Sequence, residues 1–338
     1  FEKEMGLKNR FKINCLKEYY EINEKLNLIT DECDYDLKNC SDRIIKNSQI
    51  NNFMEQKKMF LARSKQQYKN GTLKKFLIKF EKEFKTEKYL DQFNIIRNEG
   101  TSIIFDEKQK EILINFTSED GRIVISNSKI DNWKINMNNN IKENNLTNTK
   151  LTLRSKKLTG CLTIIDSIVE NIEINASNFF CEDTVNFIRT KGTIDKIKIN
   201  KSLSDGLDID FSDISIFKLD ISNSGNDCVD FSFGNYKIDK MEVSFCGDKA
   251  LSVGEKSKVV IDKFNAERSV VGIASKDSSE TKINEVTLAN LDICLTAYNK
   301  KQEFNGGLIN VNKFLCENFN HKTQIDEQST IIINGSKL

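Results

Sequence analysis

The stretch from Asp183 to Asn299 repeats an apolar pattern with a period of 22 residues. One apolar column recurs without a slip, and a second, mostly apolar column follows it two residues later. The first column consists of Val185, Leu207, Val229, Leu251, Ile273 and Leu295. A self-similar period in this range is typical of a solenoid, in which each repeat stacks only on its neighbours. The repeat therefore restricts the chain to folds made of stacked, near-identical turns.

Each repeat also carries a second group of apolar residues with the spacing of a short strand. This group is Ile194, Ile197 and Ile199 in one repeat, and it recurs in the repeats that follow. The segments are too short for helices and begin after Gly, Asn, Asp or Ser, which favour turns. The sequence thus predicts a mostly β structure, a single-stranded parallel β-helix. Equivalent residues of successive coils should then lie about 4.8 Å apart, so that each column becomes a row of neighbouring side chains.

Residues 1–98 follow a different pattern. Apolar residues at helical spacing run from Leu7 to Leu26 and again from Leu73 to Phe84. We expect this range to form an α-helical domain or a cap that shields the first coil, with an oligomerisation or tethering module as the alternative. Residues 99–338 are expected to form the β-helix, with the most regular coils in residues 183–299.

The charge balance narrows the range of partners. Lysine and arginine total 51 against 50 aspartate and glutamate, which gives a net charge of +1 and no global attraction to nucleic acid or to a membrane. The sequence has no apolar run that could span a membrane and no nucleotide-binding motif. His321 is the single histidine, which excludes histidine-based triads elsewhere and a His/Cys metal cluster. The oligomeric state and the compartment stay open.

The nine cysteines form no CxxC pair and no spacing of a small secreted domain. We expect most of them to be free thiols. Cys228 and Cys294 share a column with Gly206, Ala250 and Gly272, where the common property is small size. This column predicts tight packing at both cysteines.

Two polar columns run beside the apolar one. The first consists of Asp183, Asp205, Asp227 and Lys249, and the second of Asn186, Asp208, Asp230 and Ser252. Strict alternation would point Asp205 into the core with Leu207, and burying unpaired carboxylates costs too much free energy. We therefore expect a corner between these two residues, eased by Gly206, and an aspartate column that faces outward along one edge.

Carboxylates at this spacing repel one another, which raises the pKa of at least one of them unless a cation or a shared proton compensates. Such a cluster suits acid/base chemistry on sugars, and it suits calcium binding, with Asp208, Asp210 and Asp230 as the candidate ligands. The alternative is structural, because Asp and Asn at turns bond to nearby backbone N–H groups. A purely structural salt bridge between Lys249 and Asp227 is equally compatible with the sequence.

The last full repeat contains an insertion within residues 299–307, the segment NKKQEFNGG. Insertions in solenoids lie in loops on one face, often the binding face. The loop could form one wall of a groove, with Lys300 and Lys301 as substrate-binding residues. A tolerated surface insertion is the alternative.

Three successive segments resemble the signatures of the polygalacturonase family of right-handed β-helix glycosidases. They are Leu203-Ser204-Asp205-Gly206-Leu207, Gly225-Asn226-Asp227-Cys228-Val229 and Cys246-Gly247-Asp248-Lys249-Ala250-Leu251-Ser252-Val253-Gly254. Their order and one-coil spacing agree with the family. The resemblance implies a right-handed coil in which Asp205 and Asp227 hold the place of the carboxylates that activate water.

The chain departs from that family at two positions. Asn226 stands where the family has the aspartate usually assigned as the general acid, and Lys249 stands where it has histidine. The Arg-x-Lys that follows in the family is not matched, and only Lys276 could stand in for its lysine. Pectate lyases and alginate-type epimerases, which are similar by fold and chemistry, abstract a proton beside a carboxylate with a basic residue while a cation such as calcium neutralises the uronate. By that chemistry Lys249 or Lys276 would be the base.

The sequence therefore predicts a β-helix that binds or modifies an acidic, uronate-type polysaccharide. The candidate catalytic residues are Asp205, Asp227, Lys249 and Lys276, and the candidate substrate-binding residues are Asp208, Asp230, Asn226, Lys300 and Lys301. The alternative is a non-catalytic scaffold or protein-interaction module, including a segment of a larger protein. Carboxylates and Lys249 converging in an open cleft would favour the first hypothesis, and aspartates bonded to their own turns would favour the second.

Overall fold

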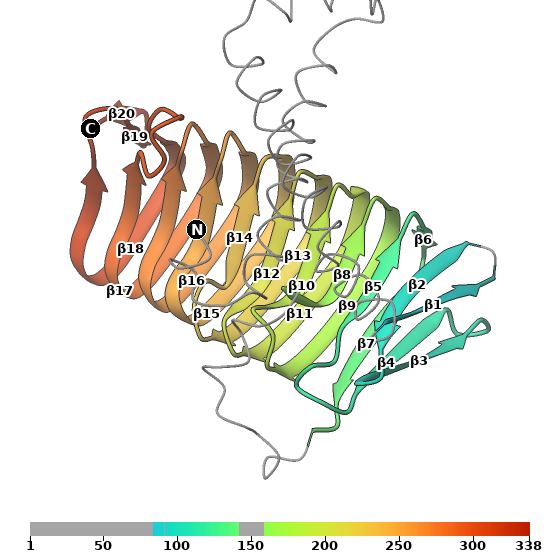
Figure 1. The fold of residues 1–338 in the computed structure, drawn as a ribbon. Coiled ribbons are helices and arrows are strands. Elements are labelled where there is room, and N and C mark those ends of the chain that lie inside the picture. The colour runs from blue at the N-terminus through green and yellow to red at the C-terminus, as the bar shows by residue number, and fades with distance from the viewer. Residues whose placement is uncertain (1–83, 91, 142–158) are drawn as a thin grey trace, which may run out of the picture. The chain divides into compact units, whose positions relative to one another are not determined.

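The computed structural model describes residues 84–90, 92–141 and 159–338, and within these ranges it contains strands and turns but no helix (Figure 1). The described residues therefore include no helix that is long and apolar enough to cross a membrane. We expected a helical domain in residues 1–98, and residues 1–83 of that range lie outside the described residues. The rest of that range is extended, because β1 (Phe84–Tyr89) and β2 (Phe93–Asn98) form an antiparallel pair. In β2 the buried Phe93 and Ile95 alternate with less buried residues, which is the period of two of a strand.

The predicted parallel β-solenoid is confirmed, with about 9 turns. A typical turn contributes a short strand and a longer one, and each pairs in parallel with its equivalent in the next turn. The short strands are β5 (Ile123–Ser126), β8 (Gly160–Ile165), β10 (Asp183–Ile188), β12 (Asp205–Asp210) and β14 (Val229–Ser232). The longer strands are β9 (Ile168–Phe179), β11 (Lys191–Ser202) and β13 (Asp213–Ser224).

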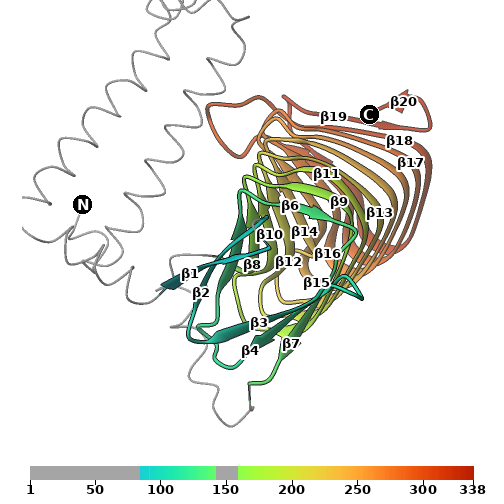
Figure 2. The same ribbon diagram turned by 90° about the vertical axis from the view of Figure 1, so that its right-hand side faces the viewer.

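In the later turns the long strand runs on through a corner into the short strand that follows it. These merged strands are β15 (Asn235–Gly254), β16 (Lys258–Lys276), β17 (Glu280–Tyr298) and β18 (Leu308–Ile325). Their C-terminal parts extend the row of short strands, since β14 pairs with residues 251–254 of β15. We call this row, from β5 to residues 321–325 of β18, the short-strand face. Figure 2 shows the successive turns lying one behind another.

The N-terminal end of the solenoid is built partly from antiparallel strands. β3 (Thr101–Asp106) and β4 (Glu111–Phe116) form a hairpin, and β2 pairs antiparallel with β5. The parallel stacking begins with β6 (Lys129–Asp131), which pairs with β9, and with β7 (Lys134–Asn139), which pairs with β4 and β9.

The 22-residue column forms the centre of the core. Strand pairing places Val185 beside Leu207, Leu207 beside Val229, and so on to Leu295, and all six side chains have no exposed surface. Burying a Val, Leu or Ile side chain contributes about 1.5–3 kcal/mol relative to leaving it exposed. The repeated column thus contributes to stability along the solenoid axis, together with the other buried columns of the core.

Left-handed residues mark the corners of the coil. One set, with φ from 54° to 64°, recurs at the turn that leads from the long strand to the next short strand: Asn178, Lys201, Asn223, Phe245, Arg268, Asn290 and Asn318. Asparagine tolerates this conformation better than most residues, whereas phenylalanine and arginine do not favour it. Stacking on neighbouring coils therefore imposes the corner on residues whose own preference lies elsewhere.

Six cysteines form disulfides, so the expectation of free thiols is wrong for them. The pairs are Cys161–Cys181, Cys228–Cys246 and Cys294–Cys316, with Cα–Cα distances of 5.5, 5.3 and 6.5 Å. Each pair has one or both partners buried and joins residues 18 to 22 apart in sequence, across the interior of the coil. A column read down the sequence contains only neighbours along the solenoid axis, so it does not indicate which cysteines meet within a turn. Cys15, Cys33 and Cys40 lie outside the described residues.

The C-terminal end is only partly covered. β19 (Thr330–Ile333) pairs with Leu308–Val311 of β18 and forms a hairpin with β20 (Ser336–Lys337). Residues 312–325 of β18 pair with β17 on one side, and no other described strand pairs with them. This part of the last coil is therefore an edge.

Candidate functional site

The first polar column lies at the corner where the short strands begin. Asp183 and Asp205 are the first residues of β10 and β12 and pair in register, and Asp227 and Lys249 follow in the next two coils. Gly206 and Leu207 are both buried in succession, so strict alternation is broken beside Gly206 as expected, and a Cβ on Gly206 would meet the Cys228 carbonyl oxygen at 2.7 Å. The structure therefore brings Asp205, Asp227 and Lys249 together, as the repeat predicted.

Two of the three carboxylates of this column are buried, contrary to expectation, and Asp205 is half-buried. Asp183 is 3% exposed and Asp227 is 4% exposed. Asp205 Oδ1 accepts hydrogen bonds from the Asp227 backbone N (2.9 Å) and from Asn226 Nδ2 (2.7 Å). Asp227 Oδ1 in turn accepts one from the Lys249 backbone N (3.0 Å). The side chains turn along the solenoid axis because these N–H groups at the corner would otherwise lack an acceptor in the strand ladder.

Lys249 neutralises the C-terminal end of this column. Its Nζ lies 3.4 Å from Asp227 Oδ1 and also contacts Asp248 Oδ2. Burial lowers the pKa of Lys249, but the hydrogen bond to Asp248 and the charge of Asp227 outweigh it, so the pKa is raised overall. The raised pKa keeps Lys249 in its ammonium form at neutral pH, which can donate a proton but not accept one, and its role as a general base stays a prediction.

Arg122 occupies the other end of the column. It is 3% exposed, and it donates hydrogen bonds to the carbonyl oxygens of Glu119 (3.0 Å) and Gly121 (2.6 Å). Burial lowers its pKa to about 10, while Asp183 and Glu182 act in the opposite direction. The guanidinium therefore remains charged at neutral pH and attracts the Asp183 carboxylate.

Burial and mutual repulsion shift the acidic groups, as expected for stacked carboxylates. Burial raises the pKa of Asp205 to about 7, Asp227 adds to the shift, and hydrogen bonds from Asn226 and the Asp227 backbone oppose it. Burial also raises the pKa of Asp183 and Asp208 well above the usual range, and neighbouring aspartates raise both further. Burial thus raises the pKa of all three aspartates, and for Asp205 it brings the pKa to about 7.

The second polar column forms its own contacts on the short-strand face. Asn186 Nδ2 donates to Asp208 Oδ2 at 2.8 Å. Lys276 is 6% exposed, donates from Nζ to Ser252 Oγ at 2.6 Å and lies 3.9 Å from Asp230 Oδ1. The sequence reasoning placed Asp230 and Lys276 in one cluster, and the structure brings them together.

The predicted calcium ligands do not form a metal site. Asp208, Asp210 and Asp230 lie on β12 and β14, but among the described residues no three His, Cys, Asp or Glu side chains are arranged to hold a metal ion. Asp208 is oriented toward Asn186 instead. The cation that compensates Asp230 is the Lys276 ammonium.

The inserted segment, residues 299–307, folds back over earlier coils, and we call it the strap. The Lys300 and Lys301 backbone N atoms both donate to Asp277 Oδ1 at 2.7 Å. The Lys301 Nζ contacts Glu255, a residue that is 6% exposed. The charge of Lys301 is therefore largely neutralised within the chain, which weakens its predicted role in binding substrate.

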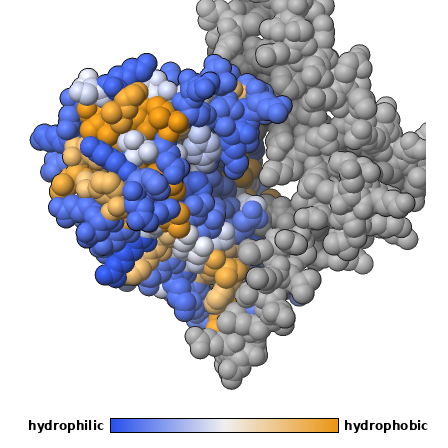
Figure 3. All heavy atoms as spheres, turned by 90° about the vertical axis from the view of Figure 1, so that its left-hand side faces the viewer, coloured by the Kyte–Doolittle hydropathy of each residue, from blue (hydrophilic) through white to orange (hydrophobic). Residues whose placement is uncertain are grey.

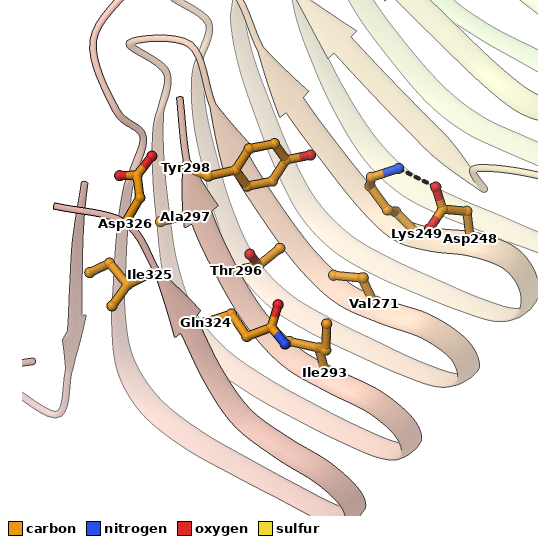
Figure 4. A pocket seen from close by; sticks show the side chains of 10 residues that line it. All are labelled: Asp248, Lys249, Val271, Ile293, Thr296, Ala297, Tyr298, Gln324, Ile325 and Asp326. Carbon is orange, nitrogen blue, oxygen red and sulfur yellow. Dashed lines mark hydrogen bonds and ion pairs between the residues drawn. The ribbon is translucent and has the colours of Figure 1, made fainter. Parts of the chain in front are cut away.

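A groove of about 510 Å³ opens on the C-terminal part of the short-strand face (Figure 4). Figure 4 shows the Tyr298 ring extending across it toward Lys249, with Thr296 and Gln324 on neighbouring strands. The lining residues are Asp248, Lys249, Val271, Ile293, Thr296, Ala297, Tyr298, Gln324, Ile325 and Asp326. The strap begins at its edge, where the Asn299 backbone N donates to Asp326 Oδ2 at 2.6 Å.

Sequence reasoning identified one residue of this groove, Lys249, and missed Tyr298 and Gln324. Strand pairing sets Tyr298 beside Lys276 and Gln324 beside Thr296. The second polar column, continued through Thr296, leads to Gln324, and the column of Asp210 and Lys276 leads to Tyr298. Tyr298 still keeps the 22-residue count from Lys276, whereas the six-residue insertion that follows it shifts Gln324 to 28 residues after Thr296.

Compared with models of protein families, with curated proteins and with solved structures, the chain matches none of them.

Proposed function

We propose that this β-solenoid binds a polysaccharide in the groove between Lys249 and Gln324, and that the polysaccharide is acidic and contains uronate. The observation that carries the proposal is the Tyr298 side chain pointing toward the Lys249 ammonium across an open groove. A row of neighbouring strands supports such a site well, because side chains one coil apart meet successive parts of an extended ligand.

The lining residues suit sugar recognition. A tyrosine ring offers a flat apolar surface for the C–H face of a sugar, and its hydroxyl offers a polar handle. Thr296 and Gln324 supply donors and acceptors for hydroxyl groups. Lys249 has three N–H donors, of which Asp248 and Asp227 engage two. The remaining donor is available for a uronate carboxylate, with which it would form a charge-assisted hydrogen bond.

The proposal is limited to binding because the candidate bases are poorly suited to proton abstraction. Lys249 is held in its charged form by two carboxylates. Lys276 is buried and donates to Ser252. Lyase or epimerase chemistry through either lysine would first require its deprotonation and access to substrate. We also propose that the coil winds in the right-handed sense, as the polygalacturonase-like segments imply. Connections between parallel strands are almost always right-handed.

A non-catalytic scaffold is the second candidate. The acceptor atoms of Asp205 and Asp227 are used by backbone N–H groups of the following coil, which is the arrangement expected for structural aspartates. On this reading the polar columns hold the coils together, and the groove has no ligand.

Binding to a glycan panel separates the two candidates. We expect the full chain to bind uronate polymers more tightly than neutral polymers, and Tyr298→Ala to weaken that binding about tenfold through loss of stacking. Phe217→Ala is the matched control, since Phe217 is 66% exposed on β13 and does not line the groove. Calorimetry gives the affinities, and assays for unsaturated products and reducing ends report turnover. Absence of binding to every glycan, or equal binding by Tyr298→Ala, would favour the scaffold.

A further inference from the structure

The charges that line the groove are few and unevenly placed. Of the described residues in its lining, Lys249 carries the one positive charge, and Asp248 and Asp326 carry negative charges. Lys300 and Lys301 of the strap are not part of the lining. One cation stands against two carboxylates, so the lining offers an ion-pair partner to one carboxylate of a ligand and repels further ones.

The side chains that follow Lys249 along the solenoid axis are apolar. Strand pairing sets Val271 beside Lys249 and Ile293 beside Val271, so both take the place of the lysine in the next two coils. Figure 4 shows them on neighbouring strands of the groove. Val271 is 7% exposed, and Ile293 is half-buried. A carboxylate held over this floor would lose water without gaining a charged partner, which costs free energy.

The far end of the groove carries a fixed negative charge. Asp326 Oδ2 accepts a hydrogen bond from the Asn299 backbone N (2.6 Å), and Oδ1 accepts one from the Gln328 backbone N (3.1 Å). Burial raises the pKa of Asp326, but hydrogen bonds from the Ser329 side chain and from backbone N–H groups lower it more, so the pKa lies below its ordinary value. The carboxylate is therefore charged at neutral pH. A second carboxylate about 4 Å away in water would bind about fivefold more weakly.

Uncharged sugars fit the surface between these two ends. Lys249 and Asp326 lie on coils that are three strand spacings apart, about 14 Å along the axis. A sugar chain that runs along the axis crosses Val271 and Ile293 on the way, and its C–H faces can pack on them. Figure 3 looks at the C-terminal end of the solenoid and shows hydrophobic residues gathered among hydrophilic ones, and Ile325 of the groove is 41% exposed. Apolar contact therefore continues to the last coil.

We propose that the groove recognises a single uronate followed by uncharged sugars, with the uronate carboxylate at Lys249. The ligand class is a heteropolysaccharide in which neutral sugars separate the uronates, and not a homopolymer of uronate. This inference rests on the proposed function, because it takes the groove to be a glycan site. Val271, Ile293 and Asp326 are its specificity-determining residues, since each disfavours a second carboxylate.

Graded reduction of carboxyl groups tests the charge spacing. Carbodiimide activation followed by borohydride converts the uronates of polygalacturonate or alginate to neutral hexoses and leaves the linkages in place. Every sugar of the starting polymers is a uronate. Calorimetry with the full chain should show the tightest binding when most of the carboxyl groups are reduced, at least about fivefold tighter than for the unreduced or the fully reduced polymer.

Two substitutions of Ile293 separate charge from shape. Ile293→Lys places a second cation on the floor and should raise the affinity for the unreduced polymer at least about fivefold, so that the preference for the reduced polymer disappears. Ile293→Gln is the matched control, because it adds a polar side chain without a charge and should leave the preference in place. Asp326→Asn keeps an acceptor oxygen, removes the negative charge and should raise the affinity for the unreduced polymer about fivefold. Circular dichroism establishes that each variant is folded.

The outcomes distinguish this inference from the proposed function. Tightest binding of the unreduced polymer by the wild type would overturn the inference and leave the proposed function standing. A folded Ile293→Lys chain that keeps the wild-type preference would overturn the inference equally. Tightest binding of the fully reduced polymer, or no binding of any of these polymers, would overturn the inference together with the proposed function.

Discussion

Asp205 and Asp227 occupy equivalent positions one coil apart, and each carboxylate accepts a backbone N–H from the following coil. This arrangement reconciles two opposing demands. The corner leaves N–H groups that need an acceptor, while stacked carboxylates repel one another and resist burial. Arg122 and Lys249, one at each end, compensate part of the negative charge. Burial, together with repulsion from Asp227, still raises the pKa of Asp205 to about 7.

Asp205→Asn should therefore stabilise the protein at alkaline pH. The folded-state pKa of Asp205 lies above its usual value of 3.8, so between about pH 4 and pH 7 the folded state binds more protons than the unfolded one. Its contribution to stability is present below this window and is lost as the pH rises through it. Asparagine keeps the acceptor oxygen and removes the charge, so we expect a gain on the order of 1 to 3 kcal/mol at pH 8 and little change at pH 4.

Urea denaturation at pH 4, 6 and 8 measures this effect. Asp239→Asn is the control, because Asp239 is an exposed aspartate on β15. A variant that is less stable than the wild type at pH 8, or a difference that does not depend on pH, would show that the Asp205 charge is already compensated.

At the scale of elements, contacts across the coil matter as much as contacts along it. The Cys228–Cys246 disulfide joins the start of the short-strand face to the long-strand part of β15. The strap links coils along the solenoid axis, since it bonds to Asp277, Glu255 and Ser278 of earlier coils. Phe304 of the strap also meets the ring of Phe233, with centroids 6.1 Å apart. These cross-links fix the cross-section of a coil whose strands are individually short.

Removing the Cys228–Cys246 bond should cost stability without changing the fold. The columns supply the replacements, because Ala250 and Gly272 follow Cys228, and Ser224 and Ser269 flank Cys246 in register. The double variant Cys228→Ala/Cys246→Ser should lose about 2–4 kcal/mol of unfolding free energy. Denaturation without reductant measures the loss, and alkylation followed by mass spectrometry verifies the bond in the wild type. Equal stability of variant and wild type would contradict the prediction.

The described solenoid, as a whole, is quasi-one-dimensional: each coil contacts its two neighbours, and the last coil has a neighbour on one side over most of its length. Stability in such an array decreases toward an uncovered end, because the end coil lacks one set of packing and hydrogen-bonding partners. The open edge of β18 and the groove beside it both result from this position.

Hydrogen exchange should reveal this gradient. We expect backbone amides of residues 312–325 in the monomer to exchange at least tenfold faster than those of β16, which has a coil on each side. Mass spectrometry of peptic fragments at low protein concentration measures the two regions in one experiment. Equal protection of β16 and residues 312–325 under these conditions would mean that the end is covered.

The sequence by itself determined which residues stack along the axis. The 22-residue period placed Asp205, Asp227 and Lys249 in one column and predicted the solenoid, because strand spacing turns a regular period into vertical neighbours. Tertiary structure decided the direction of each side chain at the corners and every contact across the coil, including the Cys228–Cys246 bond. The cross-section of the coil sets those contacts, and it results from packing among all strands of a turn, which a column read down the sequence does not contain. For the same reason the Tyr298 groove and the open edge of β18 appeared only in the folded chain.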